Sequence, residues 1–245
     1  MRAGVLALAL LLATESPVLA QSPLVAELER VATRYHEDPR SLDAVREGLA
    51  RAVAGAPHVD SLVALARACF LVGDVRATTT EEKLAAYAQG REAAQRAVAA
   101  APRRAAAHFW YATNTARWGQ TKGVLRSLFL LPEVRRGIDT VLDLDPTFTA
   151  VYSLAGNVYY EVPGFLGGDL ARAETMFRKG LEQDPKFTGM RVGLAKTLIK
   201  LGRAPEARRE LETVLGERSP SNLADWKVKD VPEARRLLQS LEGKS

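Results

Sequence analysis

The chain has 245 residues, of which 47% are hydrophobic and 26% charged, the usual mix of a globular protein with a buried core. This composition excludes an intrinsically disordered chain, and an aromatic content of only 7% with abundant alanine favours helices over strands. The formal net charge of +5 is spread along the chain without a block of like charge, so we expect no nucleic-acid partner. One cysteine, Cys69, excludes an intramolecular disulfide, and with only three histidines we expect no metal and no cofactor.

The first twenty residues have the pattern of a secretory signal peptide. Arg2 gives a positive start, an apolar run of about nine residues follows, and Val18 and Ala20 place small residues before a cleavage site. The run is far shorter than the ~20 residues that cross a bilayer, and no later stretch approaches that length. We therefore predict cleavage near Ala20, a repeat domain over 21–245 without a membrane span, and a periplasmic or secreted location. A retained N-terminal anchor is the alternative.

Proline follows helix-like segments along the rest of the chain. Because proline and the residue before it disfavour helix, each of these positions predicts a nearby helix end. The positions are Pro39, Pro57, Pro102, Pro146 and Pro185. In segments 93–98, 136–142 and 177–181, apolar or small residues recur every three or four positions, which is typical of amphipathic helices.

Two local patterns in the N-terminal half have structural interpretations. Thr79 and Glu82 have the spacing of a capping box, which predicts a helix start near residue 81. Cys69 lies among alanine and leucine, which predicts a small buried residue rather than a reactive thiol.

Two successive helix pairs repeat at a fixed period. Matching residues lie 34 positions apart in three cases: Ala173 and Ala207, Phe177 and Leu211, and Leu181 and Leu215. Thirty-four residues is the length of a tetratricopeptide (TPR) unit, which consists of two antiparallel helices. We therefore predict an all-α fold, an α-solenoid of TPR helix-turn-helix repeats, with its best-defined repeats over 150–216.

The earlier units are longer than this period. Pro57, Pro102, Pro146 and Pro185 are separated by 45, 44 and 39 residues, which exceed 34 by 11, 10 and 5. We place the excess between the two helices of each unit, as inserted loops around 74–81, 120–131 and 161–168. Insertions at equivalent places lie along one edge of a solenoid, which is often the binding face. Tolerated surface length is the alternative, but segment 124–131 is apolar enough that we expect it to pack against something.

Several motifs resemble a known family. They are HFWYATNTARWG at 108–119, LPEV at 131–134, LDP at 144–146, and PGFLGGD at 163–169 with DP at 184–185. Over about 105–240 the chain resembles TPR proteins related to the T component of TRAP transporters. The resemblance implies an all-helical periplasmic accessory protein without enzymatic activity. It also implies a substrate-binding protein as partner, one that delivers organic acids or other small hydrophobic ligands.

The predicted helix over 108–119 carries candidate groove residues. Asn114 and Trp118 lie four apart and share a helix face, where the amide can hydrogen-bond a ligand and the indole can stack on it. Tyr111 and Tyr159 are candidates for the same wall. For all four residues the alternative is packing in the core.

The second and third extra segments carry the other candidates. Lys122 and Arg126 concentrate positive charge that suits an acidic ligand or partner, or that forms a solvated surface. Phe165 lies among glycines, and Gly167 and Gly168 form a tight turn into a helix capped by Asp169. A helix start attracts a ligand carboxylate, and a purely structural turn is the alternative.

No catalytic motif is present in the sequence, including G-x-S-x-G, H-E-x-x-H and the phosphate-binding loops, so we expect no enzyme. The first hypothesis is an exported TPR scaffold or adaptor that binds a protein partner, with a TRAP-associated periplasmic subunit as the partner that the resemblance implies. The alternative is a carrier that binds a small hydrophobic organic acid or lipid-like ligand in a cavity of the solenoid.

Overall fold

The computed structural model describes residues 22–242, which form helices and no strands. The main helices are α1 (Pro23–Ala32), α2 (Ser41–Gly55), α3 (Val59–Leu71), α4 (Thr80–Ala100), α5 (Ala105–Lys122), α6 (Val124–Leu144), α7 (Thr149–Glu161), α8 (Leu170–Gln183), α9 (Thr188–Lys200), α10 (Ala204–Gly216), α11 (Leu223–Asp225) and α12 (Val231–Glu242). Short turns of π-helix, η1 (Val72–Arg76) and η3 (Trp226–Asp230), and of 3₁₀-helix, η2 (Gly164–Leu166), join some of them. The predicted signal peptide, 1–20, lies outside the described residues.

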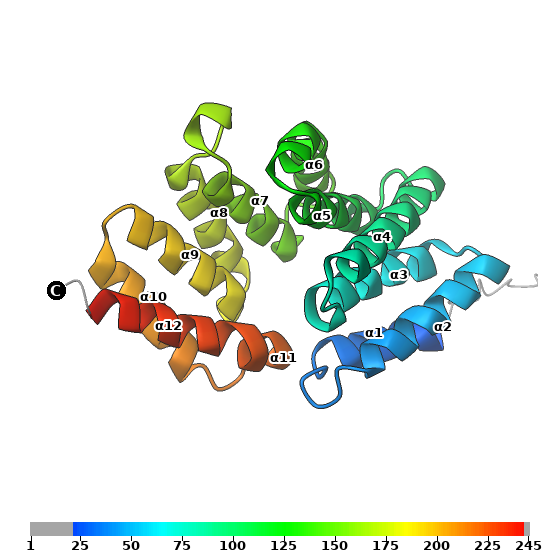
Figure 1. The fold of residues 1–245 in the computed structure, drawn as a ribbon, viewed down its shortest axis with the longest axis horizontal. Helices are drawn as coiled ribbons and strands as arrows, with labels where there is room; N and C mark the ends of the chain where they lie inside the picture. The colour runs from blue at the N-terminus through cyan, green and yellow to red at the C-terminus, as the bar shows by residue number, and fades with distance from the viewer. Residues whose placement is uncertain (1–21, 243–245) are drawn as a thin grey trace, which may run out of the picture.

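Successive helices pair and the pairs stack side by side. The pairs are α1–α2, α3–α4, α5–α6, α7–α8 and α9–α10, and Figure 1 shows them following one another around a curve. This is the α-solenoid of helix hairpins that the repeat spacing predicts, so the predicted fold class is confirmed.

Proline positions explain most of the helix ends. Each of α2, α4, α6 and α8 ends two residues before a proline, at Pro57, Pro102, Pro146 and Pro185 respectively. Pro39 differs, because α1 already ends at Ala32 and the proline lies just before α2.

Small residues let aromatic rings enter the seams between pairs. Phe177 of α8 is 1% exposed, and its ring lies between Gly156 of α7 and Gly193 of α9. A Cβ atom at either glycine would lie 2.7 or 2.6 Å from the ring, respectively. The residues one period later, Ala207 and Leu211, are fully buried as well, so the 34-residue spacing corresponds to equivalent core positions.

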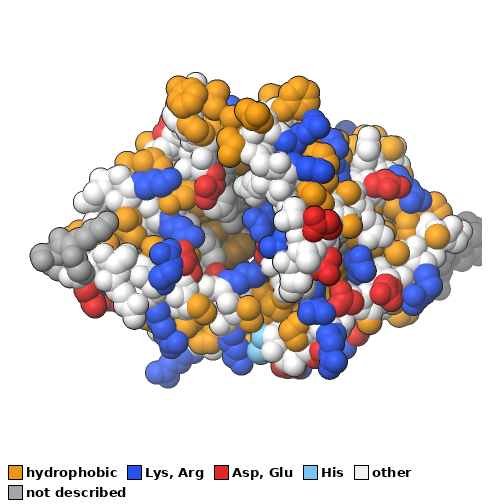
Figure 2. Space-filling view, viewed as in Figure 1, with side chains coloured by type: hydrophobic (Ala, Val, Ile, Leu, Met, Phe, Trp, Pro, Cys, Tyr) orange, Lys and Arg blue, Asp and Glu red, His pale blue; other side chains and the backbone are white. Residues whose placement is uncertain are grey.

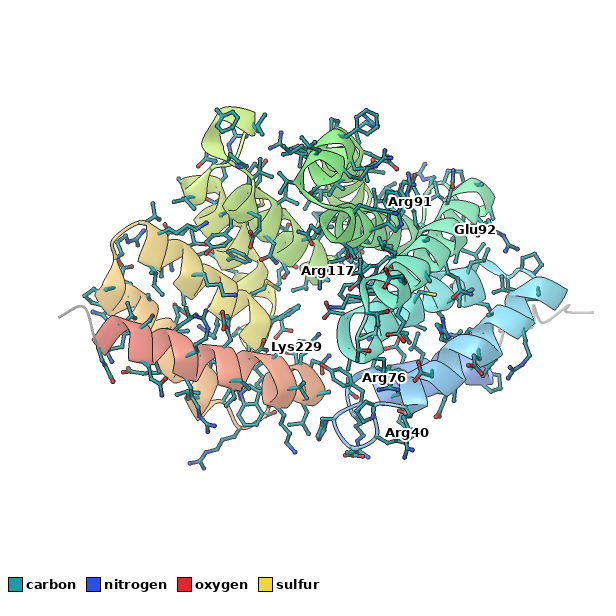
Figure 3. All side chains as sticks on the ribbon, viewed as in Figure 1. Arg40, Arg76, Arg91, Glu92, Arg117 and Lys229 are labelled. Atoms are coloured by element: carbon teal, nitrogen blue, oxygen red, sulfur yellow. The ribbon has the colours of Figure 1, made fainter. Side chains whose placement is uncertain are left out.

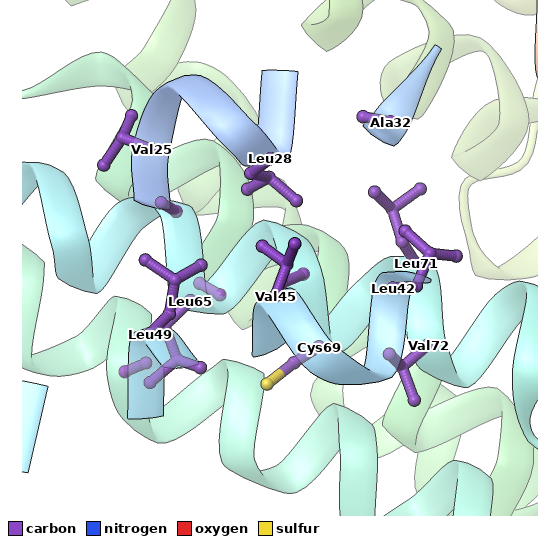
Figure 4. Packing of buried hydrophobic residues seen from close by; sticks show 14 of the residues in the cluster. Val25, Leu28, Ala32, Leu42, Val45, Leu49, Leu65, Cys69, Leu71 and Val72 are labelled. Carbon is purple, nitrogen blue, oxygen red and sulfur yellow. The ribbon is translucent and has the colours of Figure 1, made fainter. Parts of the chain in front are cut away.

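The buried side chains form two clusters. One spans α1 to α4 and includes Cys69, which lies among Val45, Leu65 and Val72 (Figure 4). The other runs from Phe109 through α12. Ala224 of α11 belongs to the first cluster although it is distant in sequence, which shows that the C-terminal segment packs against the N-terminal helices.

Hydrogen bonds between the two ends close the solenoid into a ring. The Ala224 amide donates to the Thr33 carbonyl at 3.1 Å, and the Asn222 side chain donates to the Ala32 carbonyl at 3.2 Å. The Tyr35 hydroxyl donates to the Asp225 carboxylate at 2.6 Å. We call these three bonds the closure contact, and Figure 1 shows α11 beside the turn between α1 and α2.

The extra segments take three different forms. The first continues α3 as the π-helical turn η1, and the third contains the turn η2. The second is not a loop: only Gly123, with φ of 111°, separates α5 from α6, so the extra residues lengthen both helices. The expectation that this segment packs against something is wrong for Val124, Leu125 and Phe129, which are 73–86% exposed, although Leu130 is buried.

Candidate functional site

The ring encloses a cavity with a volume of about 1220 Å³. Its wall comes mainly from the first helix of each pair, α1, α3, α5, α7 and α9, and from α11 and η3. Residues from all three extra segments line it too, including Asp74, Leu128 and Val162. Figure 2 shows the hollow at the middle of this face. We call this space the central cavity.

A row of aromatic side chains crosses the cavity wall. Phe70 contacts Trp110 with ring centroids 5.5 Å apart, and Phe109 lies 4.9 Å from both Trp110 and Phe148. These rings come from α3, from α5 and from the residue before α7, so consecutive repeats each contribute to one apolar strip.

A cluster of charges lies on the same wall. The Asp74 carboxylate pairs with Arg117 and, at 2.6 Å, with Lys229, whose ammonium also lies 2.8 Å from Asp225. Figure 3 shows Arg117 and Lys229 approaching each other from opposite sides of the ring. The cluster therefore joins η1, α5 and η3 across the cavity.

The charges in this cluster stabilise one another. Burial alone raises the pKa of Asp74, but the charges of Lys229 and Arg117 outweigh it and hold the pKa below its usual value. Burial lowers the pKa of Lys229, and Asp74 and Asp225 more than reverse this, so its pKa lies above the ordinary range. Both residues are ionised at neutral pH.

Asp225 connects the charge cluster to the closure contact. Its carboxylate accepts hydrogen bonds from the Tyr35 hydroxyl and, at 2.8 Å, from the Asn222 side chain, in addition to its ion pair with Lys229. Burial raises the pKa of Tyr35, as does the Asp225 charge, so the hydroxyl stays protonated and donates. The groups that close the ring thus also form part of the cavity wall.

Asp230 is a second buried carboxyl on this wall. It accepts a hydrogen bond of 2.6 Å from the Thr188 hydroxyl at the start of α9 and is 8% exposed. Burial raises its pKa to about 6, and the bond from Thr188 offsets part of that effect. Its protonation therefore changes in the mildly acidic range.

Sequence reasoning missed these charged residues. Asp74 lies in η1, and Lys229 and Asp230 lie in η3, so both π-helical turns carry cavity charges. No motif marks them, because Asp74 and Lys229 meet only through the closure of the ring, 155 residues apart.

The structure places two of the predicted groove residues away from the cavity wall. Asn114 is fully buried, and its amide donates to the carbonyls of Ala66 and Trp110 at 3.1 and 2.9 Å. The Tyr111 hydroxyl bonds Glu133 and accepts from Arg91 at 3.2 Å. Both residues join α5 to its neighbours, so their groove role is corrected to one in helix packing.

Trp118, Lys122 and Arg126 lie together near the α5–α6 turn. The Lys122 ammonium and the Arg126 guanidinium lie 5.6 and 5.7 Å from the Trp118 ring centroid, and Arg126 is equally close to Phe129. Both cations are exposed. Tyr159 lies apart from them, half-buried under Arg172 at 5.8 Å.

The third extra segment forms the predicted turn. Gly167 adopts the left-handed conformation with φ of 87°, and a Cβ atom on Gly168 would collide with the Val162 carbonyl. Asp169 caps α8 by accepting from the amides of Ala171 and Arg172 at 2.9 and 3.0 Å. These contacts fill the capping role, while Phe165 is 88% exposed.

The exposed apolar residues gather at one edge of the ring. Of the seven exposed large hydrophobic side chains among residues 22–242, five belong to the second and third extra segments. We call Val124, Leu125 and Phe129 the α6 tip, and Phe165 and Leu166 the η2 tip. Figure 2 shows apolar side chains grouped at the edge of the molecule where α6 and η2 stand out in Figure 1. Within the described part of the chain, no helix is both long and apolar enough to cross a membrane.

Comparisons with known proteins agree with this architecture. A family model, regulator of microtubule dynamics protein 1-3, matches residues 25–165, more than half of the chain. The chain belongs to this family. A tetratricopeptide repeat model matches residues 165–227, which include the repeats with the 34-residue period.

A solved structure of a TPR protein shows the same fold. This thermophilic protein of Thermus thermophilus covers 87% of this chain and 99% of its own at 20% identity, with a TM-score of 0.64. A TPR protein of Parabacteroides merdae ATCC 43184 covers 91% and 79% at 16% identity, with a TM-score of 0.49. The MamA protein covers 74% and 90% at 13% identity, with a TM-score of 0.49. A search of curated proteins finds no match.

The chain is therefore a TPR solenoid, an architecture of protein–protein interaction whose members are generally non-enzymatic scaffolds.

Proposed function

We propose that this protein is an exported, non-enzymatic adaptor that binds a segment of a protein partner in the central cavity. The aromatic row Phe70–Trp110–Phe109–Phe148 carries the proposal, because it offers a continuous apolar strip from successive repeats. Concave solenoid faces bind extended or helical segments by such strips. Export rests on the predicted signal peptide, and the name of the family, which refers to microtubule dynamics, does not enter the argument.

The charges around the strip indicate the chemistry of the partner segment. Arg67 pairs with Glu29, Arg104 with Asp60, and Asp74 with Arg117 and Lys229, so both signs border the apolar strip. An amphipathic segment with apolar residues on one face and mixed charges beside them fits this lining. A periplasmic substrate-binding protein of a TRAP transporter is the partner class that the sequence resemblance supports.

A substitution that fills the cavity tests the proposal. Asn157 lines the cavity and is exposed, so Asn157→Trp adds bulk there with little disturbance of the core. The matched control is Arg103→Trp on an exposed turn outside the cavity wall. In pull-downs from a periplasmic extract, we expect a specific partner with wild type and with the control, and loss of that partner with Asn157→Trp. Equal recovery with all three proteins, or no specific partner for wild type, would refute the proposal.

A second candidate function is a carrier for a small apolar acid or lipid-like molecule. The closure contact favours it, because a closed ring with a cavity of about 1220 Å³ can surround a ligand on several sides. Native mass spectrometry of the purified full chain distinguishes the two functions. A carrier retains a small molecule that Asn157→Trp excludes, whereas an adaptor shows the mass of the protein alone.

A further inference from the structure

The two tips form a surface that the adaptor function leaves unexplained. Phe165 is 88% exposed, Leu125 86% and Phe129 74%, although burying such side chains is favourable. The Arg135 guanidinium on α6 donates to the carbonyls of Leu166 and Gly167 at 3.4 and 2.7 Å, so the η2 tip is held beside α6. The two tips therefore present their apolar side chains together.

The charges beside the tips are of one sign. Segments 118–132 and 162–168, which carry both tips, contain the basic residues Lys122 and Arg126 and no acidic residue. Both cations are exposed and lie near the Trp118 ring. The next carboxylate, Glu133, is already bonded to Arg91 and Tyr111. The surface thus combines protruding apolar side chains with exposed cations.

We propose that the α6 and η2 tips dock this protein on an anionic lipid membrane surface. Aromatic and aliphatic side chains on two separate projections can enter the headgroup region, while Lys122 and Arg126 reach lipid phosphates. A second copy of the chain suits the surface less well, because a symmetric contact brings the same cations together. A protein groove fits less well too, because the tips project outward from the ring rather than forming a concave face (Figures 1 and 2).

The location of the tips gives the docking a consequence for the cavity. Val124 and Leu128 of α6, and Val162 and Pro163 before η2, line the central cavity, so the cavity extends to the base of both tips. A docked protein therefore holds this side of the cavity at the lipid surface.

Vesicle binding by variants of the full chain tests the proposal. Vesicles of phosphatidylcholine alone are compared with vesicles of phosphatidylcholine and phosphatidylglycerol in equal parts. We expect wild type to bind the anionic vesicles and Phe165→Ser to reduce binding about tenfold, because one large apolar side chain no longer inserts. Lys122→Gln and Arg126→Gln should each reduce binding about fivefold.

Matched controls keep the comparison specific. Val228→Ser removes another exposed apolar side chain and Arg103→Gln another exposed cation, both outside the tips, and neither should change binding. Residues 1–20 contain an apolar run of their own, and all variants share it. Binding that the tip variants leave unchanged would therefore overturn the proposal.

A fluorescent probe reports insertion of the tip itself. Phe165→Trp keeps an aromatic ring at an exposed position, and lipids brominated on their acyl chains quench a tryptophan that enters the bilayer. We expect stronger quenching in this variant than in wild type, which already has three tryptophans. Equal quenching, or loss of a protein partner on Phe165→Ser with vesicle binding intact, would show that the tips dock on protein and not on lipid.

Discussion

At the scale of single residues, the repeat seams depend on glycines that admit one aromatic ring. Phe177 lies between Gly156 and Gly193, so the ring cannot move away from a new methyl group on one side without meeting the other glycine. We expect Gly193→Ala to destabilise the protein by about 1 kcal/mol, because overpacking costs roughly 1–3 kcal/mol and alanine recovers roughly 1 kcal/mol of helix propensity. Urea unfolding measures the difference.

Gly55→Ala is the control for this substitution. Gly55 is also helical, and a Cβ atom there would meet nothing within 4 Å. Alanine should leave stability unchanged or raise it slightly. Equal destabilisation by the two substitutions would contradict the packing argument.

The buried carboxyl of Asp230 predicts a pH effect on stability. Its pKa is about 6 in the folded protein and about 4 in an unfolded chain, so between these values only the folded state keeps the proton. The contribution of Asp230 to stability therefore falls as the pH rises through this window, by roughly 2–3 kcal/mol. We expect Asp230→Asn to gain stability relative to wild type at pH 7 and to lose this advantage at pH 5.

Unfolding by urea at both pH values tests this effect, with Asp139→Asn at an exposed position as the matched variant. A stability difference between Asp230→Asn and wild type that is the same at pH 5 and pH 7 would show that the carboxyl does not titrate in this range.

At the scale of elements, the start of α4 depends on a reciprocal cap. The Thr79 hydroxyl accepts from the Glu82 amide at 3.2 Å, and the Glu82 carboxylate accepts from the amides of Thr78 and Thr79 at 2.8 and 3.1 Å. We expect Thr79→Ala to destabilise the protein by about 1 kcal/mol in thermal or urea unfolding. Thr80→Ala, at the next exposed position, should have little effect, and a similar loss in both variants would point to a general effect of threonine removal.

This cap was predictable from the sequence because both of its partners lie within one helical turn. The helix ends before Pro57, Pro102, Pro146 and Pro185 are local in the same way. The form of the second extra segment was not, because Gly123 reverses the chain in a single residue and the surplus then lengthens α5 and α6. Nothing in a local apolar pattern distinguishes side chains that pack from side chains that project.

At the scale of the whole molecule, the candidate site could not be read from the sequence. The aromatic wall was partly visible, since Trp110 and its neighbours lie in the motif at 108–119. The charged wall was not, because it depends on the curvature of the solenoid, which adds up from the angle between each pair and the next. Only that curvature brings Lys229 to Asp74 and Asp225 to Tyr35.

The closure contact predicts that the ring opens locally before it unfolds. Lys229→Met leaves Asp225 without its cation and Asp74 with Arg117 alone, and we expect a loss of about 2 kcal/mol after allowing for the partial exposure of Lys229. Because the loss falls on the contact between the two ends, amide hydrogen exchange should speed up roughly thirtyfold in α1, α11 and α12 while the α5–α8 core keeps its protection. Lys227→Met, two residues away and exposed, should leave exchange unchanged. Uniform acceleration in every helix would instead mean that closure is inseparable from global folding, and that the cavity has no independent route for a partner to enter through the junction of α1 and α11.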